Sequence, residues 1–99
     1  GILAAIAIPQ FSAFRARAYN ASAESQVRHA AAFLEAYFVD NDTYTTDTTA
    51  LEGYVDDPQV TITIVAGTSG NITDSYSITG VHDNGDRTYT LTGPGGQIQ

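Results

Sequence analysis

Cysteine and lysine are both absent from this 99-residue chain. Without cysteine, the fold can have neither a disulfide framework nor a thiolate site for metal or redox chemistry. All the basic residues are arginines, and Arg15, Arg17 and Arg28 fall within the first 31 positions. Because the rest of the chain offers no basic face, nucleic-acid binding by the isolated domain has little electrostatic support.

Catalytic side chains are also scarce. The chain has two histidines, and we expect His29 on a helix and His82 in a turn, both exposed to solvent. No serine lies in a nucleophile-elbow pattern, so a histidine-activated nucleophile would need residues from unrelated loops. We therefore expect that this protein is not an enzyme.

Charge divides the chain into two parts. Residues 1–31 carry three arginines against Glu24, whereas residues 32–99 carry eight aspartates and two glutamates against Arg87. The length fits a single domain with one modest core. We expect residues 1–26 to form a basic projecting helical stem and residues 27–99 to form an acidic globular head.

The first eleven residues, Gly1 to Phe11, form an uncharged and largely apolar run. This run is too short to span a bilayer, which needs about 20 residues. Pro9 lacks an N–H and clashes with the preceding turn, so it either begins a helix or kinks one. We expect the helix of the chain in solution to start near residue 9.

A long helix is predicted from residue 9 to about residue 41. Apolar residues recur at three- and four-residue spacing in its second half, which is typical of one buried helical stripe. Upstream, Phe11, Phe14, Ala18 and Ala21 form a second apolar stripe with no obvious partner inside the chain. About thirty helical residues span about 45 Å. The first half of the helix should therefore project beyond the head.

The period of the pattern changes to two after residue 58, which predicts strands. We expect strands over residues 59–66, 73–82 and 87–92, with the Asn84-Gly85 dipeptide in the second connection. A Thr49/Glu52 capping box predicts one helical turn in the preceding connector, closed by Gly53. The predicted fold is α+β, with one long N-terminal helix packed on a three- or four-stranded antiparallel β-meander. The predicted head core is Val27, Leu34, Phe38, Val60, Ile62, Ile64, Tyr76, Ile78, Tyr89 and Leu91.

Acidic turns are the one feature that bears on cofactors. Clusters such as Asp83-Asn-Gly-Asp86 contain the oxygen ligands that calcium prefers, although the spacing is not that of an EF-hand. Asn and Asp also favour turns because they tolerate left-handed backbone and bond to their own main chain. Asp83 and Asp86 are therefore weak calcium candidates, and no other cofactor is expected.

The sequence Gly1-Ile-Leu-Ala-Ala-Ile-Ala-Ile-Pro9, followed by Gln10 and Phe11, resembles the second half of the N-terminal stem of bacterial type IV pilins and type II secretion pseudopilins. Tyr44, Leu51 and Tyr54 extend the similarity into the helix-to-sheet loop. The resemblance implies that a further apolar half-stem precedes Gly1 in the full subunit.

The resemblance to pilins implies a structural subunit of an extracellular type IV pilus, an adhesion- or motility-type appendage. Identical subunits would pack through their stems into a helical filament, after residence in the inner membrane and handling by the pilus assembly machinery. Arg15, Arg17 and Arg28 would pair with carboxylates of neighbouring subunits. The implied filament-packing residues are Ile2, Leu3, Ile6, Ile8, Pro9, Phe11 and Phe14.

Three alternatives remain open at this point. The first is a minor pilin or a type II secretion pseudopilin. The second is a conductive pilin, because Phe11, Phe14, Tyr19, Phe38 and Tyr44 lie where short conductive pilins place aromatics. The third is a free-standing secreted binding domain, which the unpartnered Phe11/Phe14 stripe argues against.

Overall fold

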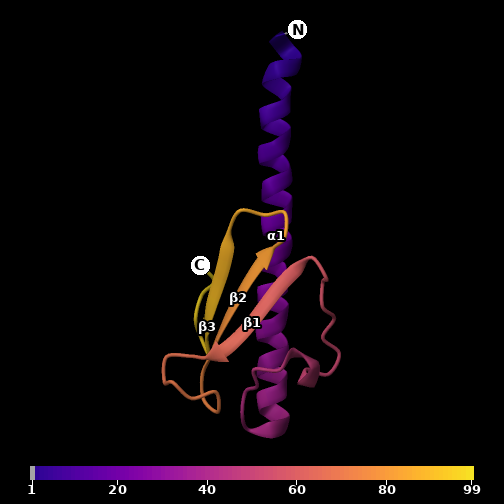
Figure 1. Ribbon diagram of the computed structural model, residues 1–99. Helices are drawn as coiled ribbons and strands as arrows, with labels where there is room; N and C mark the ends of the chain where they lie inside the picture. The colour runs from indigo at the N-terminus through magenta and orange to yellow at the C-terminus, as the bar shows by residue number, and fades with distance from the viewer. Residues whose placement is uncertain (1) are drawn as a thin grey trace.

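One helix and one small sheet make up the protein, which is therefore α+β (Figure 1). The structure, a computed structural model, describes the backbone of residues 2–99 and the side chains of residues 13–99. Helix α1 spans Ile2–Asn41, and the principal extents of the molecule are 61 × 25 × 16 Å. Figure 1 shows the N-terminal half of α1 standing clear of the sheet, as the helix length predicted.

Helix α1 is continuous through Pro9, so the expected start near residue 9 is wrong. A proline removes one backbone hydrogen bond and can be accommodated by a kink. The residues around it are mostly Ala, Leu and Ile, with no glycine between residues 2 and 41. Ala and Leu have high helix propensity, which helps the helix to continue on both sides of the proline.

The C-terminal end of α1 lies where the sequence predicted. Asp42 adopts a φ of 58°, in the left-handed region that ends many helices. Its N–H donates to the Phe38 carbonyl at 2.8 Å, and the Asn41 amide donates to the Tyr37 carbonyl at 3.0 Å. The first bond satisfies a carbonyl of the last turn that has no partner within the helix, and the second adds a side-chain donor to that turn.

The sheet is a three-stranded antiparallel meander in the order β1-β2-β3. Strand β1 spans Val60–Ala66, β2 spans Tyr76–His82 and β3 spans Thr88–Gly93. Ile64 pairs with Ile78, and Ile78 pairs with Leu91, which aligns apolar side chains across the three strands. The C-terminal tail folds back along β3, where Ile98 bridges Leu91.

Strand β2 begins at residue 76, so the predicted start at residue 73 is wrong. The side chain of Asn71 accepts from the N–H of Thr73 at 3.0 Å, and its carbonyl accepts from the N–H of Ser75 at 3.1 Å. Such bonds hold an Asx-type turn, which competes with strand pairing. The local turn therefore takes residues 73–75 out of the strand.

The core lies between α1 and the inner face of the sheet. Every predicted head-core residue belongs to the buried cluster or packs against it, with Phe38 and Ile62 among the partly buried members. At Gly80, a Cβ atom would lie only 2.5 Å from Val27 Cγ2, so the helix approaches β2 closely at this point. The fully buried helix residues are Ala23, Val27, Ala30 and Leu34.

Packing against the sheet begins earlier in α1 than the expected boundary at residue 27. Tyr19 stacks on His82 with a centroid distance of 4.6 Å. The Asn20 amide donates to Asp86 Oδ1 at 2.7 Å, and Asn20 Oδ1 accepts from the Asp86 N–H at 3.1 Å. The β2–β3 loop therefore contacts α1 two turns before residue 27.

A structured connector links α1 to β1. It contains the 3-10 helix η1, Thr48–Ala50, where the Asp47 side chain accepts from the Thr49 N–H. The cap is thus Asp47, and the predicted cap at Thr49 is wrong, because the short Asp carboxylate already bonds both the N–H and the hydroxyl of Thr49. Leu51 is buried and fixes the connector on the core.

Candidate functional site

An uncovered strip, apolar except for Ser25 and His29 at its middle, follows the back of α1. Phe14 and Val39 are 71 % and 83 % exposed, and the alanines that lie between them on this side are exposed as well. Phe14 and Ala23 are nine residues apart, or about two and a half helical turns, so they face opposite directions. This back strip consists of Phe14, Ala18, Ala21, Ala32, Ala36 and Val39.

Among the predicted filament-packing residues, only Phe14 has a side chain that the structure describes. It lies on the back strip, away from the sheet, as the sequence pattern predicted. The side chains of Ile2, Leu3, Ile6, Ile8, Pro9 and Phe11 lie outside the described residues.

The three arginines of α1 are not equivalent. Arg28 Nη2 lies 3.1 Å from Glu24 Oε1, one helical turn away, so the predicted intersubunit partner already has a partner in its own helix. Their side chains are 59 % and 34 % exposed, and such surface pairs contribute little stability. Arg15 and Arg17 are exposed on the part of α1 that precedes Tyr19, which stacks on His82 of β2.

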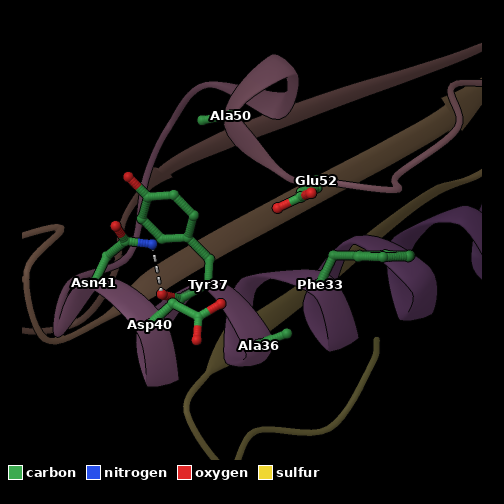
Figure 2. A pocket seen from close by; sticks show the side chains of 7 residues that line it. All are labelled: Phe33, Ala36, Tyr37, Asp40, Asn41, Ala50 and Glu52. Atoms are coloured by element: carbon green, nitrogen blue, oxygen red, sulfur yellow. Dashed lines mark hydrogen bonds between the residues drawn. The ribbon is translucent and has the colours of Figure 1, made fainter.

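A groove of about 330 Å³ opens between α1 and the η1 connector. Figure 2 shows Asp40 and Glu52 flanking this space, with the rings of Phe33 and Tyr37 beside them. Ala36, Asn41 and Ala50 complete the lining. The sequence pattern did not predict this groove, because the groove depends on the path of the connector.

A polar cluster joins α1, the connector and the sheet. The Tyr76 hydroxyl donates to Glu35 Oε1 at 3.1 Å, and the Tyr44 hydroxyl lies 3.2 Å from both Glu35 oxygens. Burial, and then the hydrogen bond to the Glu35 carboxylate, raise the pKa of Tyr76 well above its ordinary value. Burial and the Glu35 charge also raise the pKa of Tyr44. The cluster fixes three segments that are distant in sequence.

His82 is buried, so the expectation that it would be a solvated turn residue is wrong. It ends β2, stacks on Tyr19, and accepts through Nδ1 from the Asn84 N–H at 3.0 Å. The loop that follows, residues 83–87, is longer than the two-residue turn that Asn-Gly favours. Asn84 supplies this bond to His82, and Gly85 donates to the His82 carbonyl at 3.0 Å.

The weak calcium candidates Asp83 and Asp86 lie in this same loop, and both are exposed. Asp86 Oδ1 accepts from Asn20, which gives it a structural role at the contact with α1. Across the residues that the structure describes, no group of three or more His, Asp or Glu side chains is arranged to hold a metal ion.

The aromatic side chains bear on the conductive alternative. Phe38 and Tyr76 both pack on Tyr44, each with a centroid distance of 4.7 Å. Phe33 and Tyr54 form a separate pair at 5.7 Å. Each of these pairs joins α1, the connector or the sheet within one molecule, which is the usual role of aromatic residues in a core.

No protein-family model matches the chain, and no curated protein matches it at a significant level of similarity. Over the described part of the chain, no helix combines the length and the apolar character needed to cross a membrane. The function must therefore be argued from the geometry of α1, the back strip and the groove.

Proposed function

We propose that this protein is a structural subunit of an extracellular type IV pilus-like filament and that it assembles through α1. The proposal joins the resemblance of residues 1–11 to pilin stems with the shape of the molecule. In the filament, α1 helices would pack side by side in the core, and the acidic sheet and connector would face outward. Before assembly, the full subunit would reside in the inner membrane.

The back strip is the observation that carries this proposal. A helix that served only the core of this domain would need one apolar face, and α1 has a second face opposite the first. Its small alanines allow close approach of another helix, and burial of Phe14 alone would contribute about 1.5–3 kcal/mol. A head-to-tail arrangement of identical copies gives an open filament when the rotation between copies does not close a ring.

The direct test is to isolate surface filaments from cells that make the protein and to identify their subunits by mass spectrometry. We expect this chain as the most abundant component. A trace amount would instead indicate a minor pilin, and recovery only with a secretion complex would indicate a pseudopilin. Its absence from all filaments would overturn the proposal.

The back strip can be tested separately by adding one charge to it. Ala18→Glu places a carboxylate on the strip, and we expect it to block assembly, seen by electron microscopy, while the monomer keeps its helix content. Thr63→Glu is the matched control, because Thr63 is exposed on β1, away from α1's back. Equal assembly by both variants would show that the strip is not the packing surface.

A deletion tests the first eleven residues of the stem. Removal of residues 1–11 should abolish self-association of the chain in sedimentation experiments and leave the head folded. The physical reason is that association must overcome about 4–15 kcal/mol of lost freedom, and the deleted apolar residues would supply much of the compensating burial. Self-association equal to that of the intact chain would place the contacts in residues 12–99 and not in the deleted segment.

A further inference from the structure

The groove between α1 and the connector combines two features that suit a guanidinium group. The carboxylates of Asp40 and Glu52 lie on either side of it, and the rings of Phe33 and Tyr37 form part of its lining (Figure 2). Guanidinium pairs with carboxylates through charged hydrogen bonds and also stacks on aromatic faces. Among the residues that the structure describes, no basic side chain lines the groove.

We propose that this groove binds Arg17 from the stem of a second copy of the chain. This inference rests on the filament function proposed above and names one contact within it. The chain has no lysine, so an identical partner can offer only arginines. Arg28 is paired with Glu24, and the Arg87 guanidinium lies 4.8 Å from the centre of the Tyr89 ring.

The axial spacing supports this contact. Arg17 and Asp40 are 23 residues apart in α1, which corresponds to about 35 Å at 1.5 Å per residue. The segment of α1 that packs on the sheet, from Tyr19 to Phe38, is about 29 Å long. Sliding one parallel copy along the other by about 35 Å therefore brings Arg17 level with the groove. The same shift places the two sheets end to end instead of in collision.

The direction of Arg17 around α1 also agrees. Two parallel copies related by translation meet through opposite faces of their helices. At about 100° per residue, Arg17 points about 140–160° away from Phe33, Tyr37 and Asp40. Arg15 points within about 40° of those three residues, and so lies on the same side of α1 as the groove. Arg17 is therefore the arginine presented to the groove of a translated neighbour.

A charge exchange tests the contact in the full chain. We expect Arg17→Glu alone and Glu52→Arg alone each to weaken self-association about tenfold, as for a close charge pair at an interface. The two changes in one chain should restore most of that affinity, because the pair is rebuilt with its charges exchanged. Sedimentation equilibrium at 0.1 M and 1 M salt gives the affinities, and the wild-type association should weaken at the higher salt.

Matched controls separate this contact from a general charge effect. Arg15→Glu makes the same change on the other side of the stem, and Asp83→Arg makes the same change as Glu52→Arg, outside the groove. Arg15→Glu should weaken self-association less than Arg17→Glu does, and Asp83→Arg less than Glu52→Arg does. Combining Arg15→Glu with Glu52→Arg, or Arg17→Glu with Asp83→Arg, should not restore the affinity. Rescue through Arg15 instead of Arg17 would overturn the proposed geometry.

A cross-linking measurement covers the case in which a charge variant fails to fold. The chain has no cysteine, so chains carrying Ala13→Cys can be mixed with chains carrying Ala50→Cys and treated with a short bis-maleimide. Ala13 lies one turn before Arg17 on the same side of α1. We expect mixed dimers from this pair, and fewer from Ala18→Cys with Ala50→Cys. Equal yields would overturn the contact.

The outcomes also distinguish the groove from the filament. Filaments that form normally with Arg17→Glu would overturn the groove contact and leave the filament function in place. Charge-exchange rescue in solution, without the chain in any cellular filament, would support the groove contact and overturn the filament function. Absence of self-association at any concentration would overturn both.

Discussion

Two faces of the same helix differ in what covers them. On the inner face, Leu34 is fully buried under the sheet, whereas on the back strip Phe14 is 71 % exposed. Both faces are rich in alanine and carry two or three larger apolar residues. The comparison teaches that an apolar helix stripe in a sequence indicates burial but does not indicate by what. In this protein the inner face builds the monomer, and we infer that the back strip builds the assembly.

Truncation of one large side chain on each face should lower the free energy of unfolding by very different amounts. Leu34→Ala is expected to lower the free energy of unfolding by about 2–5 kcal/mol, because it leaves a cavity in the core. Phe14→Ala should change it by less than about 0.5 kcal/mol in the monomer. Urea denaturation of both variants provides the measurement. Similar losses at the two positions would contradict the division of α1 into two functional faces.

Gly80, on the sheet, tests how closely the inner face of α1 packs against β2. Gly80→Ala would place a methyl group 2.5 Å from Val27 Cγ2 and 2.9 Å from Ile62 Cδ1, so the helix must shift or the core must rearrange. We expect a loss of about 1–3 kcal/mol, as for other overpacked cores. Val27→Ala in the same chain should recover part of this loss. Strict additivity of the two changes would show that Gly80 does not limit the approach of α1.

Alkaline pH should loosen the inner face through Tyr76. Because the pKa of Tyr76 is raised in the folded protein, its neutral form is favoured there. Its contribution is fully present below the ordinary tyrosine pKa of about 10 and is lost as pH rises above that value, by at most about 1.4 kcal/mol per pH unit. Denaturation at pH 8 and pH 11 measures this loss.

The Tyr76→Phe variant isolates that contribution. It should lose less stability than the wild type between pH 8 and pH 11, since the titrating hydroxyl is gone. Glu35→Gln should also show a smaller alkaline loss, because the hydrogen bond to a carboxylate and its charge both help to raise the pKa of Tyr76. An unchanged alkaline loss in Tyr76→Phe would assign the effect to other tyrosines.

Periodicity predicted the elements of this fold because each element turns one face to the core along its length, so its core-facing residues recur at a constant spacing. The three- and four-residue spacing located the inner face of α1, and the alternation around Ile64 and Ile78 located β1 and β2. The burial of His82 was missed even though it continues the inward alternation of Ile78 and Gly80. At this position the period of the strand predicts burial better than the Asn84-Gly85 turn signal does.

The groove could not be predicted for a different physical reason. It depends on where the connector passes over α1, which is fixed by long-range contacts such as the bond between Tyr54 and Gln26 at 3.1 Å. A single sequence gives no information about such pairs. The Asp47 cap could have been found, because Asp is a strong N-cap residue just before the Thr-rich turn.

The smallest expected effect concerns the Arg28–Glu24 pair on the exposed side of α1. Arg28→Gln should lower the free energy of unfolding by only about 0.3–0.5 kcal/mol, because the pair is exposed and one helical turn apart. The loss should shrink in 1 M salt, where the Debye length falls to about 3 Å. Arg17→Gln, which lies before the first contact with the sheet, should leave monomer stability unchanged and weaken only self-association. A loss above about 1 kcal/mol at Arg28, or one that salt does not reduce, would mean that this arginine stabilises the helix through packing of its aliphatic side-chain atoms. In that case Arg28 would belong to the monomer and not to the assembly.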